Sequence, residues 1–326
     1  MSDRWADSGL ARVFVLAPIH DDAMAQLKAD VRIEVIAWNQ SGVERWIEEA
    51  DAVILRGLSL KEEDVRRAKR LRVIGRHGAG VDSVPLEAAK ARGIAVLNTP
   101  FENSRAVAEL VVALMMASAR KLVHADRLVK IGAWKDGRAG IGSRELNGAR
   151  VGFVGFGRIA RMAATILRDG FDMQIHAYDP LLPEAAWEVS GQGVTLHTEI
   201  GALFAPSDFV SINLPLTADT RGLVSDEVLS ASKPGLILVN TSRGGIVDEA
   251  ALAARLRDGT LRAAASDVFE KEPPDPSAAL LQLPNFIATP HFGGATEDSL
   301  RLVGKTIAAQ TILALFGEAD AAYRVV

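Results

Sequence analysis

The chain has 326 residues and a net charge of −4, and 48% of its residues are hydrophobic and 24% charged. Because one hydrophobic core rarely organises this many residues, we expect two domains. The sequence has no cysteine, which excludes disulfides and thiolate ligands, and it has neither a basic run nor a membrane-length apolar run, so we expect neither nucleic acid nor membrane as a partner. Residues 1–9 are polar and carry no secretory signal pattern, from which we expect a cytoplasmic protein.

Apolar runs alternate with amphipathic segments through the first hundred residues. The alternation predicts helices at residues 21–29, 43–50, 61–71 and 84–92. Between them it predicts strands at residues 12–17, 32–37, 52–56, 71–75 and 94–98. This βαβα order is typical of a parallel sheet covered by helices on both faces, with right-handed crossovers.

A long helix is expected to begin near Ser104, a good N-cap residue, and to run to about residue 132. A helix of this length is unusual within one domain, so we interpret it as a connector between two domains. A second α/β run follows, with a last helix at 297–316 after a Gly293-Gly294 pair that suits a hinge. Its strands are predicted at residues 150–154, 173–178, 194–197, 209–213, 236–240, 262–266 and 286–288.

The stretch VGFVGFGRIA at residues 151–160 is the most informative part of the sequence. It predicts a buried strand, a glycine turn and the start of a helix, in which Gly155 permits the tight turn and Gly157 lets a pyrophosphate approach the backbone. Ala160 allows the helix to lie close to the strand. Asp179 follows the next strand 22 positions after Gly157, close to the roughly 20 expected for a carboxylate that binds ribose hydroxyls. This pattern favours a dinucleotide site, and the carboxylate favours NAD over NADP.

Further motifs follow the glycine turn in a fixed order. They are NLPLT at 213–217, VNTSRGGIVD at 239–248, DVFEKEP at 267–273 and Thr289-Pro290-His291. In this order they resemble the D-isomer-specific 2-hydroxyacid dehydrogenases. The upstream stretches RHGAGVD at 76–82, NTP at 98–100 and VAE at 107–109 resemble the phosphoglycerate dehydrogenase branch of that family.

The resemblance implies an α/β architecture of two doubly wound parallel-sheet domains. A Rossmann NAD domain, residues 104–293, would be inserted in a flavodoxin-like substrate domain built from residues 1–103 and 294–326. The active site would lie in the cleft between them, and family enzymes are usually homodimers through the cofactor domain. Some relatives carry a C-terminal regulatory domain, which we expect to be absent here.

The resemblance also implies the catalytic residues. His291 follows a predicted strand and would be the general acid/base, since an imidazole can take or give the hydroxyl proton near neutral pH. Glu272 would orient the ring and favour its charged form, and the family pattern selects it over the neighbouring Glu270. Arg243 would hold the substrate carboxylate in a fixed fork and polarise the carbonyl oxygen.

Cofactor contacts are implied at the glycine turn and at the ends of later strands. Asp267 would meet the nicotinamide carboxamide, with a turn or cap role as the alternative. The remaining cofactor candidates are Gly155, Gly157, Arg158, Ile159, Asp179, Pro215 and Thr241.

Substrate contacts are implied in the first domain. The backbone of Gly78, Ala79 and Gly80 would bind the substrate carboxylate as an anion nest, with a simple turn as the alternative. Arg56 would meet a distal phosphate or sulfonate, or else be a surface ion-pair residue. His77 is not the small residue expected at its position, and the sequence does not determine where its side chain points.

Together these residues and the resemblance predict an NAD-dependent dehydrogenase that acts on a small D-2-hydroxy acid and its 2-oxo acid partner. The resemblance favours 3-phosphoglycerate or a close analogue such as hydroxypyruvate or glyoxylate. No metal is expected, since Arg243 supplies the positive charge. One alternative is an NAD(H)-sensing regulator of the same fold. Another is a phosphite or formate dehydrogenase, of which the formate type is disfavoured because it pairs its histidine with glutamine.

Overall fold

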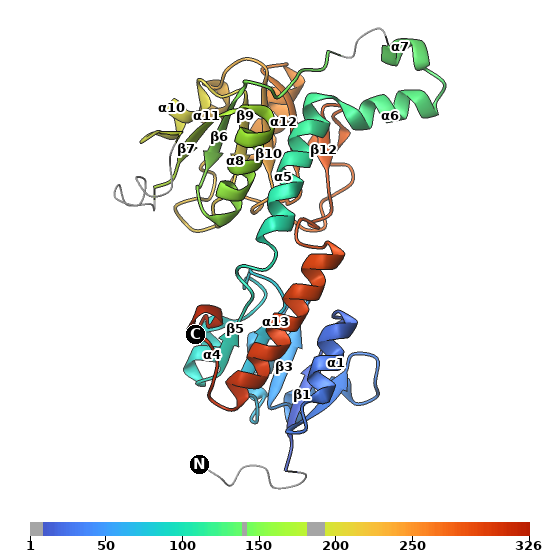
Figure 1. The fold of residues 1–326 in the computed structure, drawn as a ribbon, viewed down its shortest axis with the longest axis vertical. Coiled ribbons are helices and arrows are strands. Elements are labelled where there is room, and N and C mark those ends of the chain that lie inside the picture. Colours follow the sequence, from blue (N-terminus) through green and yellow to red (C-terminus); the bar gives the residue numbers. More distant parts are fainter. Residues whose placement is uncertain (1–8, 139–141, 181–192) are drawn as a thin grey trace. The chain divides into compact units, whose positions relative to one another are not determined.

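The computed structural model describes residues 9–138, 142–180 and 193–326. The chain divides into two compact units, Met1–Ser104 with Gly294–Val326, and Arg105–Gly293. Each unit is built around its own parallel sheet (Figure 1).

The first unit has five parallel strands in the order β2-β1-β3-β4-β5. Because β1 begins the chain but lies inside the sheet, the helices that follow successive strands cover both faces, which is the flavodoxin-like arrangement. The strands are β1 Ala11–Val15, β2 Ile33–Ala37, β3 Ala52–Leu55, β4 Val73–Arg76 and β5 Ala95–Leu97. The helices are α1 Asp21–Ala29, η1 Val43–Arg45, α2 Trp46–Glu49, α3 Glu62–Arg67, α4 Leu86–Ala91, α13 Glu297–Leu315 and η3 Ala321–Tyr323.

The C-terminal helix α13 belongs to this first unit and packs beside α1 on the sheet (Figure 1). Thr296 caps its N-terminus by accepting the N–H of Ser299 at 3.1 Å. The helix lies very close to β4, since a Cβ added at Gly75 would be 2.5 Å from Thr311 Oγ1. Ile307 and Ile312 complete a core with residues of β1 and β3, so the last helix is needed to cover this face.

The second unit has seven parallel strands in the order β12-β11-β10-β9-β6-β7-β8. The order reverses at β6, as in a Rossmann sheet, and this places a crevice at the carboxyl ends of β6 and β9. The strands are β6 Arg150–Val154, β7 Gln174–Tyr178, β8 Val194–Leu196, β9 Phe209–Ile212, β10 Leu236–Asn240, β11 Leu261–Ser266 and β12 Phe286–Ala288. The helices are α5 Ser104–Ala119, α6 Leu122–Lys130, α7 Trp134–Arg138, α8 Arg158–Phe171, α10 Ile200–Phe204, α11 Asp226–Ser230, α12 Glu249–Arg257 and η2 Ala279–Gln282.

Both faces of the second unit's sheet are buried at its centre. All five residues of β10 are buried, and the strand reads as a continuous apolar run before Asn240. Val151 and Phe153 pack with α8 and α5 in one core, whereas Val154 packs with α12 in the other. The predicted pair of doubly wound parallel sheets is therefore confirmed.

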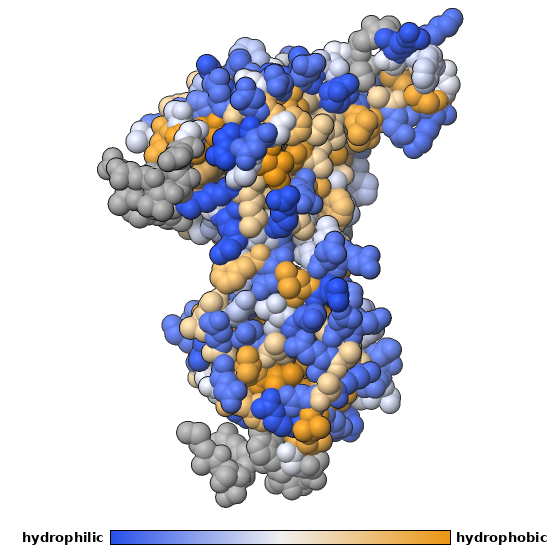
Figure 2. Space-filling view, viewed as in Figure 1, coloured by the Kyte–Doolittle hydropathy of each residue, from blue (hydrophilic) through white to orange (hydrophobic). Residues whose placement is uncertain are grey.

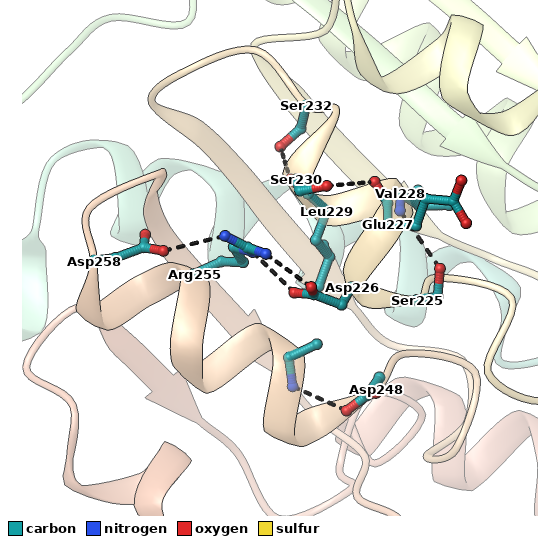
Figure 3. Close-up of polar contacts among 11 residues, drawn as sticks. Ser225, Asp226, Glu227, Val228, Leu229, Ser230, Ser232, Asp248, Arg255 and Asp258 are labelled. Carbon is teal, nitrogen blue, oxygen red and sulfur yellow. Dashed lines mark hydrogen bonds and ion pairs between the residues drawn. The ribbon is translucent and has the colours of Figure 1, made fainter.

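Helix caps hold α11 and α12 in place (Figure 3). Ser225 and Asp248 accept the backbone N–H groups of Val228 and Ala251, respectively, in the first turns of these helices. Arg255 of α12 also donates to both carboxylate oxygens of Asp226 on α11, at 2.9 and 2.8 Å. These contacts fix the helix that follows the Arg243 loop.

The predicted long helix from Ser104 to residue 132 is wrong. The structure has two helices, α5 and α6, with Lys121 between them in the left-handed region at φ 49°. The carbonyl of Ala119 accepts the N–H of Arg144 at 3.0 Å instead of continuing the helix. In the described residues, no helix is long and apolar enough to cross a membrane.

Candidate active site

The glycine turn follows β6, at the point where the strand order reverses. Gly155 has φ 87°, and a Cβ there would lie 2.9 Å from the backbone carbonyl of Asn213. Its N–H donates to the Tyr178 carbonyl at 2.7 Å. Glycine is therefore required at this position both by its dihedral angle and by the adjacent strand end.

The helix α8 begins directly after this turn. Gly157 is its N-cap and supplies no side-chain hydrogen bond to the first turn, and a Cβ at Gly157 would meet no described atom within 4 Å. Arg158 is exposed and Ile159 half-buried in that turn, and Ala160 is fully buried. A 14-residue helix whose N-terminus has a glycine cap suits an anion such as a pyrophosphate.

The other predicted cofactor residues follow neighbouring strands. The Asp179 carboxylate accepts the N–H of Phe156 at 2.8 Å and is thereby held beside the glycine turn. Pro215 is exposed after β9. Thr241 follows β10, and its buried Oγ1 has no partner among the described residues. The turn, the helix N-terminus and Asp179 together fit NAD, which the Pro215 and Thr241 segments would flank.

His291 and Glu272 form a hydrogen-bonded pair. The Nδ1 of His291 lies 2.7 Å from Oε2 of Glu272, and Oε1 of the same carboxylate accepts the N–H of Phe269 at 3.1 Å. His291 has a left-handed backbone at φ 50°. Both side chains remain accessible, at 48% and 39% exposure. With Nδ1 engaged by the carboxylate, Nε2 is the ring atom left to exchange a proton with a ligand.

Arg243 lies in a loop organised by Asn240. Asn240 Nδ2 donates to the Arg243 carbonyl at 3.0 Å, and its Oδ1 accepts the Ser242 N–H at 3.1 Å. A Cβ at Gly244 would be 1.9 Å from the carbonyl oxygen of Phe269. The loop that carries Arg243 therefore lies directly on the backbone of the segment that carries Glu272.

The strand order explains why the loops that carry these three residues leave the same edge of the sheet. Arg243 follows β10, Glu272 follows β11 and His291 follows β12, and these are three neighbouring parallel strands. Their carboxyl ends share one edge with the glycine turn after β6 and Asp179 after β7. In sheets of this kind ligands bind at that edge.

Asp267 is almost completely buried, at 1% exposure. Its Oδ1 accepts from the Thr289 hydroxyl at 2.6 Å and from the Phe292 N–H at 3.0 Å. Its Oδ2 accepts the Gly293 N–H at 2.8 Å. Sequence reasoning placed Asp267 near the nicotinamide but gave no sign of these contacts, which join it to the loop that carries His291.

The predicted substrate residues belong to the first unit. Arg56 follows β3 and donates to the Pro18 carbonyl at 3.2 Å. Gly78 has φ 125°, and its N–H donates to Thr99 Oγ1 at 2.9 Å. Of the proposed nest, Ala79 and Gly80 therefore remain as candidate donors to a ligand.

His77 points into the first unit, at 5% exposure. Its Nε2 has no partner among the described residues and lies 3.7 Å from where a Cβ at Gly304 of α13 would be. Burial, assisted by the positive charge of Arg56, lowers the pKa of His77 from 6.5 to about 4. The side chain is therefore neutral near neutral pH.

Within the described residues, no group of three or more His, Asp or Glu side chains is arranged to hold a metal ion. Two residues of the site were missed by sequence reasoning. Gly244 and Asn240 lie inside a motif that was recognised. The contact that defines the role of Gly244 is with Phe269, which is distant in the chain, whereas Asn240 acts within its own loop, on Ser242 and Arg243.

The fold and the glycine turn define a dinucleotide-binding α/β protein. Residues 112–293 match the family model described as D-isomer specific 2-hydroxyacid dehydrogenase, NAD binding domain. The chain belongs to the D-isomer-specific 2-hydroxyacid dehydrogenase family, and these residues form its NAD-binding domain.

Relatives agree with this assignment. The chain is 38% identical over 312 residues to D-3-phosphoglycerate dehydrogenase of Methanocaldococcus jannaschii, which covers 95% of this chain and 58% of that protein. It is 37% identical over 298 residues to hydroxypyruvate reductase of Thermotoga maritima, covering 90% and 94% respectively. The solved 2-hydroxyacid dehydrogenase of Ketogulonicigenium vulgare Y25 superposes with a TM-score of 0.80 at 31% identity, covering 97% of this chain and 98% of that chain. The chain spans little more than half the length of the archaeal D-3-phosphoglycerate dehydrogenases that it matches.

Proposed function

We propose that this protein is an NAD-dependent oxidoreductase that transfers a hydride between NAD(H) and a small D-2-hydroxy acid or its 2-oxo acid partner. The observation that carries the proposal is the His291–Glu272 pair, 2.7 Å apart. Glu272 follows β11, which is next to the strand that precedes Arg243, and His291 follows β12 on the other side of β11. All three residues lie in a domain that matches the family's NAD-binding model.

In this proposal, His291 exchanges the hydroxyl proton with the substrate. In oxidation, its neutral Nε2 takes the hydroxyl proton of the substrate, and in reduction the protonated ring returns a proton to the carbonyl oxygen. Glu272 at Nδ1 orients the ring and stabilises the imidazolium. Bound NAD supplies the hydride acceptor at this site.

Arg243 binds the carboxylate of the substrate. A guanidinium can hold a carboxylate by two parallel hydrogen bonds, and this fixes the substrate carbon that reacts. The same charge polarises the neighbouring carbonyl oxygen, so the protein needs no metal for this step. The Asn240 contacts keep the Arg243 backbone in place during binding.

The substrate proposed is 3-phosphoglycerate or an analogue such as hydroxypyruvate or glyoxylate. Two of the relatives carry the names D-3-phosphoglycerate dehydrogenase and hydroxypyruvate reductase. In this proposal the backbone of Ala79 and Gly80 binds the carboxylate end. Arg56 meets a distal phosphate when the substrate carries one.

The first experiment measures NADH oxidation with a panel of 2-oxo acids that includes hydroxypyruvate, glyoxylate and 3-phosphohydroxypyruvate. We expect turnover with at least one of them, and loss of at least about 10³-fold in kcat/KM in His291→Gln and Arg243→Gln. Both variants should retain NADH binding. Tight NADH binding without turnover of any acid would favour the NAD(H)-sensing alternative.

A second experiment tests the phosphate contact. Arg56→Gln should raise KM for 3-phosphoglycerate by about tenfold or more and leave the KM for D-glycerate within about twofold. An equal change for both substrates would show that Arg56 does not recognise the phosphate.

We also infer a homodimer formed through the second unit. The helix α6 has no buried residue, and its region shows apolar side chains among polar ones on the surface (Figure 2). Leu122, Val123, Val129, Ile131 and Trp134 are each 52% to 67% exposed, an apolar surface of the kind that a partner subunit covers. Light scattering should give a dimer for the wild type and for Lys130→Gln, and a monomer for the doubly substituted Leu122→Glu, Ile131→Glu.

A further inference from the structure

The loop that carries His291 is held by one buried carboxylate. Residues 289–293 donate three hydrogen bonds to Asp267, from the Thr289 hydroxyl and from the N–H groups of Phe292 and Gly293. These donors flank His291 on both sides in sequence. The position of the imidazole therefore depends on Asp267, which does not touch the ring in the described contacts.

We propose that Asp267 is the positioning residue of His291, an inference that rests on the proposed function of His291 as acid/base. Asp267 fixes the backbone of the 289–293 loop, and the loop in turn places Nδ1 of His291 against Glu272. The role differs from a contact with the nicotinamide, because its effect reaches the reaction through the imidazole.

The backbone of His291 shows why an anchor is needed. A non-glycine residue at φ 50° is strained and stays there only when its surroundings hold it. The two N–H groups that follow His291 both end on the Asp267 carboxylate, at 3.0 and 2.8 Å. Loss of these acceptors would let the backbone relax and carry the ring away from Glu272.

The chemistry of the contacts selects a carboxylate at position 267. All three groups that face it act as donors, and an ionised carboxylate offers acceptors only. An amide in its place would turn an NH₂ group toward an N–H or hydroxyl donor. A carboxylate has about four lone-pair sites, so the three contacts leave it room for about one further partner, such as a cofactor amide.

Glu272 is anchored to the same segment. Its Oε1 accepts the N–H of Phe269, two residues after Asp267. Gly293 lets the loop approach, since a Cβ there would already be 3.1 Å from Asp267 Oδ2. The short stretch after β11 thus holds both members of the His291–Glu272 pair. It holds Glu272 through the N–H of Phe269, and it holds the His291 loop through the carboxylate of Asp267.

The test uses Asp267→Asn and Thr289→Val, with Thr289→Ser as the matched control that keeps the hydroxyl donor. The first readout is the NMR titration of the His291 ring in the enzyme without cofactor, with the signal assigned by its loss in His291→Gln. Of the charged side chains in the described residues, Glu272 is the one that bonds to His291. We therefore expect Asp267→Asn and Glu272→Gln each to move the titration midpoint to lower pH, and the double variant to move it no further than Glu272→Gln alone.

The second readout is steady-state kinetics with the best substrate. Asp267→Asn should lower kcat by about 10²-fold with KM for the 2-oxo acid within about threefold, because the imidazole is displaced while Arg243 is not. Thr289→Val should change both readouts in the same direction as Asp267→Asn, but by a smaller amount. Thr289→Ser, which keeps the hydroxyl donor, should behave like the wild type. If Asp267→Asn does not fold, Thr289→Val still tests the role of Asp267, because it removes one of the hydrogen bonds to that carboxylate.

Two results would overturn the inference. One is an unchanged His291 titration in folded Asp267→Asn and in Thr289→Val. The other is weaker NADH binding by Asp267→Asn without movement of the His291 titration, which would make Asp267 a cofactor contact alone. Absence of turnover in the wild type would instead count against the proposed function, and the NMR titration would still decide the role of Asp267.

Discussion

The α-carbon of Gly244 lies against the backbone carbonyl of Phe269, so closely that a Cβ at Gly244 would be 1.9 Å from the Phe269 oxygen and 2.5 Å from the Glu270 nitrogen. The two residues follow the neighbouring strands β10 and β11. One is adjacent to Arg243 and the other donates its N–H to Glu272. This contact sets the spacing between the loop that carries Arg243 and the loop that carries Glu272.

Gly244→Ala should separate these loops, because a backbone atom cannot give way as a flexible side chain can. We expect kcat/KM for the 2-oxo acid to fall by about 10²-fold or more and the melting temperature to fall as well. The control is Gly170→Ala in α8, where a Cβ meets nothing within 4 Å and helix propensity predicts a gain of about 0.5–1 kcal/mol. Wild-type kinetics in folded Gly244→Ala would show that the loop spacing is not critical.

Glu272→Gln should move the pH profiles of both reaction directions to lower pH. The amide can still accept a hydrogen bond from Nδ1 of His291, but it lacks the charge that stabilises the imidazolium. Oxidation should rise and reduction decline over a lower pH range than in the wild type. The measurement is kcat/KM in both directions across pH, and Glu270→Gln serves as control because the backbone at Glu270 bonds to Glu249 instead. Unmoved profiles in Glu272→Gln would refute the pairing.

Gly155→Ala should lower the stability of the protein, whereas Gly157→Ala should lower its affinity for NADH. At Gly155 the positive φ and the 2.9 Å approach to Asn213 strain the folded protein, so we expect a loss of at least ~1–3 kcal/mol of stability. At Gly157 a Cβ has free space in the protein but occupies the approach of the pyrophosphate. Thermal unfolding should be unchanged in Gly157→Ala, whereas its Kd for NADH should rise by about tenfold or more. Unchanged NADH affinity in Gly157→Ala would contradict this placement of the cofactor.

His77 should make stability depend on pH in mildly acidic solution. Burial, with the charge of Arg56, lowers its pKa from 6.5 to about 4, so the unfolded chain binds a proton at a higher pH than the folded chain does. Stability is therefore complete above about pH 6.5 and is lost as pH falls toward 4, by about 3 kcal/mol in total from this one group. Urea unfolding from pH 7 to 4.5 should show a smaller decrease in His77→Leu and in His77→Gln, since neither side chain titrates. Equal slopes in all three proteins would mean that His77 takes up its proton without cost.

Much of the architecture could be predicted from the sequence because its signals are local. Buried parallel strands read as apolar runs, and the predicted strands at 150–154, 236–240 and 286–288 coincide with β6, β10 and β12. The helix at 21–29 coincides with α1 for the same reason. The glycine turn with Asp179 indicated a dinucleotide, and the ordered motifs placed the chain in its family.

The site itself was predicted only as a set of candidate residues. His291 and Glu272 were paired on a motif, and the structure places their side chains within hydrogen-bond distance. Their catalytic roles stay predictions until the variants are measured. The anchoring of Gly78 by Thr99 was not foreseen, since the two residues meet only because β4 and β5 are neighbours.

The sequence by itself determined the two parallel sheets, the strand positions and the kind of cofactor. It could do so because strand periodicity, glycine turns and short motifs depend on residues that are close together in the sequence. The tertiary structure alone decided where α5 ends, through the N–H that Arg144 donates to Ala119. It alone decided the use of Asp267 as an anchor and the need for glycine at position 244. These features arise from close approach between segments that are not adjacent in the chain. For Asp267 and Gly244, the approach is fixed by the order in which β10, β11 and β12 pair.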